Sequence, residues 1–296
     1  MRTHLALGGN EAVDRELGRK IGEGGCAEVY EWEDGSKVVK LAKANTNAFA
    51  IRRELSNTRI AWESGLPVPK PYGFIEIDGR PGAIFDRIEG ESMMQSFMRL
   101  LQQTDRLPTE SEKPPFFHEV IDQTVRLLHR IHGLPADNMP LQRDDLEYGI
   151  RHQRHLNEEE IEAVIALLER LPRKRQLCHG DLNPGNIIVR DGEPIAIDWN
   201  NATCGSPEAD IAEYVVMIRY GILPPELSME AGAAFDRIRE PFIERFMEEY
   251  TRLTGITYAD VDPWIAPIAA RKLYADAISE EEKQRLVDEI RRRMGR

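Results

Sequence analysis

The sequence predicts an α+β fold, with short antiparallel strands in about the first 90 residues and mainly helices after them. Two observations support this prediction. In the first part, apolar runs alternate with turns such as Asp34-Gly35 and Asp78-Gly79, which are typical of β-hairpins. In the second part, apolar residues recur at the spacing of helices. A chain of 296 residues can form one large domain or two lobes, and it can bury a sizeable core.

Composition narrows the class of partner. The formal net charge of -12 disfavours binding to nucleic acid and is compatible with a cationic small molecule. The three cysteines form no CxxC pair, as expected for reduced thiols in a cytoplasmic protein. The first 14 residues lack the apolar segment of a signal peptide, and no run is long enough to span a membrane. We therefore expect no nucleic-acid or membrane partner, and the oligomeric state stays open.

The strand-rich part begins with a glycine-rich segment over residues 21–30. Gly22 and Gly24 would let the backbone lie close to phosphates, although a plain hairpin turn also explains such glycines. A strand over residues 38–41 follows and carries Lys40. A helix is then expected over residues 48–62, with Glu54 on it and Phe49, Leu55, Ile60 and Trp62 as its apolar positions.

The prolines within residues 66–71 exclude a helix and indicate an extended connection. It leads into strands over residues 72–77 and 83–85. The remainder is expected to be helical over residues 93–103, 116–132, 157–171, 211–220, 231–253, 263–276 and 279–296. Residues 104–115 and 133–149 are interpreted as loops, the second of them rich in acids. The last helix, with Leu286 and Ile290 as its main apolar positions, is expected to be a solvated cap or, less favoured, a partner surface.

The most informative stretch is residues 179–198. Asp181 and Asn186 lie five apart on a loop broken by proline and glycine, so neither is expected on a helix. Asp191-Gly192 then predicts a hairpin that returns the chain and brings Asp198 beside Asn186. Three oxygen-bearing side chains would thus converge, and oxygen ligands suit Mg²⁺. A polar hairpin with solvated carboxylates is the alternative.

These residues, in the order His179-Gly180-Asp181 through Asn186 to Asp198, resemble the catalytic and metal loops of the protein-kinase-like fold. The variant here resembles the aminoglycoside phosphotransferase and choline kinase family. The resemblance implies a bilobal fold. Residues 1–90 would form an N-lobe with a small antiparallel β-sheet and one helix, and residues 91–296 a larger, mainly helical C-lobe.

The resemblance also implies site residues. Asp181, with Asn186, would be catalytic, and Asn186 and Asp198 would hold Mg²⁺. Asp210 would hydrogen-bond the catalytic-loop backbone. Lys40 would contact the phosphates of ATP, with Glu54 as its ion-pair partner, although Ala27 replaces one glycine of the kinase loop. The nucleotide would be bound by Gly22, Gly24, Val29, Lys40, Glu54, Phe85, the carbonyl group of Asp86 and the amide group of Ile88.

The implied function is transfer of the γ-phosphoryl group of ATP to a hydroxyl group of a small molecule, such as an aminoglycoside-like compound, an amino alcohol or a sugar. The short gap between Asp198 and Asp210 leaves no room for the activation segment of a typical protein kinase. An atypical protein kinase and a non-catalytic nucleotide-binding module are the alternatives. The presence of Lys40, Asp181, Asn186 and Asp198 together argues against the second alternative.

Overall fold

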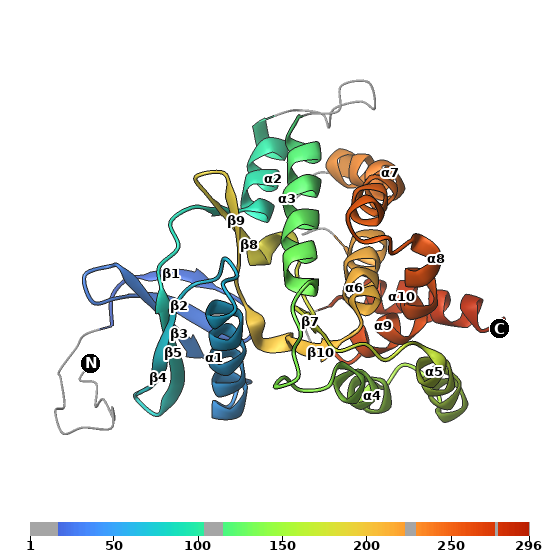
Figure 1. Cartoon of the computed structure of the whole chain (residues 1–296), viewed down its shortest axis with the longest axis horizontal. Coiled ribbons are helices and arrows are strands. Elements are labelled where there is room, and N and C mark those ends of the chain that lie inside the picture. The colour runs from blue at the N-terminus through green and yellow to red at the C-terminus, as the bar shows by residue number, and fades with distance from the viewer. Residues whose placement is uncertain (1–16, 104–114, 223–228, 276–277, 296) are drawn as a thin grey trace. The chain divides into compact units, whose positions relative to one another are not determined.

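The computed structural model describes residues 17–103, 115–222, 229–275 and 278–295 (Figure 1). The chain divides into two compact units, one made of Met1–Glu91 with Ile188–Asn201 and the other of Ser92–Ile187 with Ala202–Arg296. The first contains an antiparallel sheet and the second is mainly helical, which confirms the predicted fold class. The predicted loop over residues 104–115 and the first 16 residues lie outside the described residues, apart from Pro115.

The sheet of the first unit has five strands in the order β1-β2-β3-β5-β4. Their bounds are β1 (Lys20–Glu23), β2 (Ala27–Trp32), β3 (Lys37–Ala42), β4 (Pro71–Ile77) and β5 (Arg80–Asp86). Asp78 and Gly79 both have positive φ angles, of 50° and 75°, so the predicted two-residue turn joins β4 to β5. In the central strand β3, Lys40 lies opposite Val29 of β2 and Ala83 of β5.

The two faces of this sheet carry separate apolar clusters, because successive side chains of a strand point to opposite faces. One cluster consists of Trp32, Val39, Leu41, Ile75, Ile77 and Ile84. The other consists of Ala42, Ala83 and Phe85 together with Ile51 of helix α1 (Ala48–Glu63). Helix α1 therefore covers this second face (Figure 1).

Helix α1 has almost its predicted bounds, but its buried face differs from the prediction. Phe49 and Trp62 are 73% and 42% exposed. Polar residues, including Glu54, Asn57 and Thr58, are buried instead. Each has a partner: Asn57 donates to the carbonyl oxygen of Trp199 at 2.9 Å, and Thr58 donates to that of Glu54 at 2.8 Å. Because the partners lie far along the chain or in the backbone, apolar periodicity could not identify this face.

The predicted hairpin after the catalytic loop is present as strands β8 (Ile187–Arg190) and β9 (Glu193–Ala196), which are neighbours in one sheet. Asp191 and Gly192 have φ angles of 53° and 81°, as a two-residue hairpin turn requires. The amide group of Ala196 donates to the carbonyl oxygen of Pro67 at 2.9 Å, which ties the hairpin to its own unit.

The second unit is built from helices. They are α2 (Met93–Gln103), α3 (Pro115–His132), α4 (Gln142–His152), α5 (Glu158–Arg170), α6 (Pro207–Tyr220), α7 (Met229–Thr254), α8 (Tyr258–Val261), α9 (Ile265–Lys272) and α10 (Glu280–Arg293). Strand β6 (Glu91–Ser92) precedes α2, and β7 (Gln176–Cys178) pairs with β10 (Thr203–Gly205). Helix α6 is buried from Pro207 to Val216 and forms the centre of this unit.

Two predictions for the second unit were wrong. The expected loop over residues 133–149 contains helix α4, which buries Gln142, Leu146, Gly149 and Ile150 along one face. Helix α10 is no solvated cap, since Leu286 and Ile290 are fully buried and the helix packs against α9. Within the described ranges, no helix is both long and apolar enough to cross a membrane.

Candidate active site

Three charged side chains meet in the first unit. The Lys40 Nζ atom lies 2.7 Å from Glu54 Oε1 and 3.1 Å from Asp198 Oδ1. Lys40 comes from the central strand β3, Glu54 from the buried face of α1, and Asp198 from the segment after β9. The structure thus contains the predicted Lys40–Glu54 pair, and it adds Asp198 as a second partner of the same ammonium group.

Burial and charge act in opposite directions on this triad. Burial raises the pKa of Glu54 to about 7, against the attraction of the Lys40 ammonium group. Burial alone would lower the pKa of Lys40, but the carboxylates of Glu54 and Asp198 outweigh it and raise that pKa. Lys40 therefore keeps its positive charge, as its predicted role in phosphate binding requires.

The backbone at Asp198 has the left-handed conformation, with φ of 64°. Few residues other than glycine adopt it, although aspartate and asparagine do so more often than most. The next residue, Trp199, is fully buried, and its Nε1 atom donates to the carbonyl oxygen of Ala196 at 3.2 Å. The buried indole ring and this turn fix the segment, while the carboxylate of Asp198 stays 42% exposed beside Lys40.

The other residues predicted to bind the nucleotide lie in the same sheet or directly after its strands. Gly22 pairs with Val29 between β1 and β2. Phe85 is buried against α1, and Asp86 ends β5, where its carboxylate accepts a hydrogen bond from the Tyr72 hydroxyl group at 2.6 Å. Gly24 follows β1, and Ile88 follows β5 outside any helix or strand. Their roles in adenine and phosphate binding stay predictions.

The loop over residues 179–186, which the sequence predicts to be the catalytic loop, belongs to the second unit and is held by its own side chains. Asn183 Nδ2 donates to Asp181 Oδ1 at 2.9 Å, and Asn186 Nδ2 donates to the Asp181 carbonyl oxygen at 2.9 Å. Asn186 ends a short 3₁₀ turn, Pro184–Asn186, so the prediction that it lies outside any helix was wrong. Asn183 caps this turn and proline begins it, which stabilises the turn locally.

Asp210, in the first turn of α6, anchors the loop. Its carboxylate accepts hydrogen bonds from the backbone amides of His179 at 2.7 Å and Gly180 at 2.6 Å. It also pairs with His132 Nε2 at 3.0 Å, and His132 Nδ1 lies 2.7 Å from the Tyr250 hydroxyl group. Burial opposes ionisation of Asp210, but the bond from His132 and the backbone donors lower its pKa overall. The predicted hydrogen bonds from Asp210 to the loop backbone are confirmed, and His132 supports Asp210 from α3.

Sequence reasoning missed one cation beside this loop. Arg271 of α9 reaches the Gly180 carbonyl oxygen, 3.5 Å from its Nη2 atom, and forms an ion pair with Glu213 of α6. Arg271 belongs to no motif, and some 90 residues separate it from the loop. Tertiary contacts alone bring it there.

The sequence and the fold are both similar to those of known phosphotransferases. The sequence pattern described as "Phosphotransferase enzyme family" matches residues 18–264. The fold is similar to the crystal structure of aminoglycoside phosphotransferase APH(4)-Ia, with a TM-score of 0.62 and 16% identity over 94% of this chain and 93% of that one. It is also similar to the amicoumacin kinase hAmiN in complex with AMP-PNP and Ca²⁺, with a TM-score of 0.60 and 15% identity over 94% and 88%.

Among curated sequences, methylthioribose kinase from Bacillus thuringiensis (strain Al Hakam) is 30% identical over 112 residues. That match covers 36% of this chain and 28% of the relative. The chain therefore aligns with less than a third of the length of that protein.

Proposed function

Because the chain belongs to the phosphotransferase enzyme family, we propose that it transfers the γ-phosphoryl group of ATP to a hydroxyl group of a small molecule. The observation that carries the proposal is the Lys40 ammonium group held between Glu54 and Asp198. A protonated lysine fixed by a buried carboxylate suits the phosphates of a nucleotide. The AMP-PNP and ADP complexes of proteins with this fold support the same ligand class.

The proposed roles follow from the chemistry of each group. Asp181 accepts the proton of the acceptor hydroxyl group or orients that group, since Asn183 and Asn186 hold its loop. Lys40 binds the phosphates, and Glu54 keeps it in place. Gly22 and Gly24, together with the backbone groups of Asp86 and Ile88, bind the rest of the nucleotide. Phosphoryl transfer depends mainly on such positioning and on charge stabilisation.

Asn186 and Asp198 have the oxygen donors that Mg²⁺ prefers. The Asn186 Nδ2 atom is committed to the Asp181 carbonyl oxygen, so its Oδ1 atom is the one suited to a cation. The Asp198 carboxylate is partly exposed on a constrained backbone. When bound, Mg²⁺ would neutralise phosphate charge.

Helix α4 and the turn after α9 offer groups that suit the acceptor. Asp145 and Asp181 both lie within electrostatic range of the Arg271 guanidinium group, so Asp145 belongs to the neighbourhood of the catalytic loop. One turn further along α4, Tyr148 is 52% exposed, and its ring centroid is 5.7 Å from that of Tyr274. A carboxylate beside aromatic rings suits an acceptor with an amino group. We propose this surface as part of the acceptor site.

The test is ADP release with Mg·ATP across aminoglycosides, amino alcohols, nucleosides and sugars, including methylthioribose. We expect Asp181→Asn to lower turnover on an active acceptor by about 10²–10⁴-fold, because general acid–base groups contribute that much. Nucleotide affinity should change little. Asp191→Asn is the matched control, since Asp191 lies at the hairpin turn, where asparagine is equally suited to the positive φ.

Equal turnover in Asp181→Asn and the wild-type protein would refute the assigned role of Asp181. Phosphorylation of added polypeptides, with no active small molecule, would favour the atypical protein kinase. Nucleotide binding without transfer to any acceptor would favour the regulatory module.

A further inference from the structure

Three segments of the second unit contact the Arg271 side chain: helix α6, helix α4 and the loop that contains Gly180. Its side chain is 24% exposed, and its Nη2 atom pairs with the Glu213 carboxylate, which is 11% exposed. The same nitrogen points to the carbonyl oxygen of Gly180, 3.5 Å away, at the long limit of a hydrogen bond. Arg271 thus links α9 and α6 to the residue just before Asp181.

Helix α4 provides the space for this side chain. A Cβ atom added to Gly149 would lie 2.8 Å from Arg271 Cγ, closer than such atoms approach in proteins. Only glycine at this position therefore lets the arginine stem pass. A stem confined by Gly149 and a head group paired with Glu213 leave the guanidinium little freedom.

Gly180 is held from both sides. Its amide group donates to Asp210 Oδ1 at 2.6 Å, and its carbonyl group faces Arg271. Its φ angle of 76° lies in the region that glycine adopts most readily. The carbonyl group belongs to the peptide unit that joins Gly180 to Asp181. Asp210 of α6 therefore holds the peptide unit before Gly180, and Arg271 of α9 holds the peptide unit after it.

The charge of Arg271 also faces the site. Burial would lower its pKa, but Glu213, Asp181 and Asp145 outweigh this effect and raise it. The guanidinium group is thus a permanent positive charge among carboxylates, one of which is the proposed base.

We propose that Arg271 is a positioning residue that holds the Gly180–Asp181 peptide unit and thereby places the Asp181 carboxylate for reaction with the acceptor. Glu213 and Gly149 support it. The claim that Arg271 holds the loop in place does not depend on which reaction the protein catalyses. The claim that Arg271 affects turnover rests on the proposed function.

The first experiment measures amide hydrogen exchange in peptides covering residues 176–187. In these peptides, amide hydrogens of the Arg271→Gln variant should exchange faster than those of the wild-type protein. The exchange rate of the Arg271→Lys variant should lie between those of the other two proteins. Gly149→Ala should act in the same direction without removing any charge. The matched control is Arg239→Gln: Arg239 is 8% exposed and donates to carbonyl oxygens of Ile218 and Gly221, away from the catalytic loop.

The second experiment compares steady-state rates on an active acceptor. Arg271→Gln should lower kcat by about 10²-fold, the scale of a small misplacement of a catalytic group, with the KM for ATP nearly unchanged. Guanidinium at sub-denaturing concentration should restore part of the activity of Arg271→Ala and none of any loss in Arg239→Ala.

Wild-type exchange at residues 176–187 in Arg271→Gln would overturn the inference whether or not the protein is active. So would faster exchange spread equally over the whole second unit, since this would indicate a general loss of stability. Absence of transfer by the wild-type protein, with the exchange result as expected, would refute the proposed function and leave the placement of the loop standing.

Discussion

Each unit contains a buried carboxylate that orders the groups around it, Glu54 in the first unit and Asp210 in the second. Asp210 accepts from two backbone amides and pairs with His132. Glu54 is buried against Lys40. Both are costly to bury as anions, and both are compensated by partners from distant segments.

We expect Asp210→Asn to destabilise the protein by about 3–5 kcal/mol, because asparagine turns an amino group toward donors and leaves buried groups unpaired. Urea unfolding monitored by circular dichroism measures this loss. The control is Asp137→Asn, which removes an exposed pair with Arg175 and should change stability little.

The sign of the pH dependence follows from the lowered pKa of Asp210. Its contribution is present above the unfolded-state pKa of about 4 and is lost as pH falls through the folded-state value. The stability difference between the wild-type protein and Asp210→Asn should therefore shrink with acidification. A difference that stays constant down to pH 2 would contradict an ionised Asp210.

Among single residues, the sequence predicted those whose positions follow from their spacing along a short stretch of chain. Asp181, Asn186 and Asp198 were identified because a loop and a hairpin fix their separation along the chain. Asp210 followed from the family resemblance, which implies an aspartate at the start of the next helix. Arg271 was missed, since it acts through contacts between helices and lies in an ordinary helical segment.

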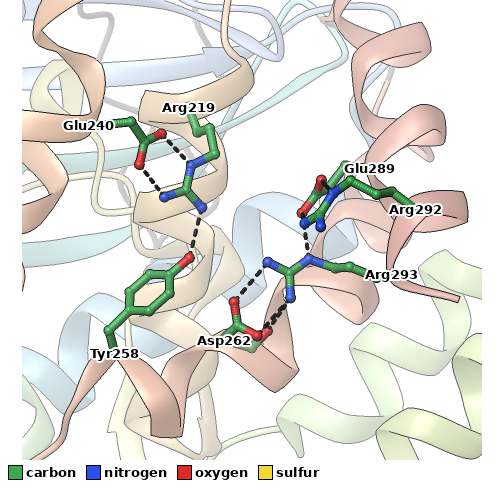
Figure 2. A network of polar contacts seen from close by, with 7 residues as sticks. All are labelled: Arg219, Glu240, Tyr258, Asp262, Glu289, Arg292 and Arg293. Carbon is green, nitrogen blue, oxygen red and sulfur yellow. Dashed lines mark hydrogen bonds and ion pairs between the residues drawn. The ribbon is translucent and has the colours of Figure 1, made fainter. Parts of the chain in front are cut away.

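Among the elements, α10 depends on ion pairs at its C-terminal turn (Figure 2). Arg293 contacts both carboxylate oxygens of Asp262, at 2.8 and 2.9 Å, and Glu289 at 2.5 Å. Arg292 adds two contacts to Glu289, at 2.7 and 2.8 Å. In the same view, Arg219 joins Glu240 to Tyr258. These pairs and the buried Leu286 and Ile290 hold α10 against its own unit.

We expect Glu289→Gln to destabilise the protein near neutral pH, by about 1–3 kcal/mol, because two arginines lose a buried partner. Although burial opposes ionisation, the hydrogen bonds from Arg292 and Arg293 lower the pKa of Glu289 to about 2. The stabilisation is therefore complete above the ordinary value of 4.5 and disappears as pH falls toward 2. Thermal unfolding of both proteins between pH 7 and pH 2.5 measures it.

The control is Glu281→Gln on the same helix, whose carboxylate is 66% exposed and pairs with Arg285. The Glu281→Gln variant should lose almost no stability relative to the wild-type protein at any pH. An equal loss in both variants would assign the effect to helix charge in general and contradict the role of the Glu289 network.

Elements with strong local signals were predicted well, and those defined by packing were not. The turns at Asp34-Gly35, Asp78-Gly79 and Asp191-Gly192 are encoded within a few residues, and the structure has a strand on each side of every one of them. Helix α4 was missed because its buried face includes Gln142 and Gly149. Helix α10 was expected to be solvated because most of its residues are charged, yet Glu282 and Glu289 are among those buried.

At the scale of the whole molecule, ligand binding should raise the stability of the folded protein. A ligand that binds only the folded state at 100 times its Kd stabilises that state by about 2.7 kcal/mol. For a chain of this size, the corresponding rise in Tm is about 5 °C. The proposed nucleotide site predicts a rise in Tm that depends on both ATP and Mg²⁺.

Asp198→Asn tests this dependence without disturbing the backbone, because asparagine also tolerates the left-handed conformation found there. It removes one carboxylate from Lys40 and from the proposed cation, while the bond between Lys40 and Glu54 stays. We expect Mg·ATP to raise the Tm of the wild-type protein but not that of the variant, and ATP with a chelator to have a small effect on both. An equal rise in both proteins would show that Asp198 binds no cation, and the proposed metal ligands would then reduce to Asn186.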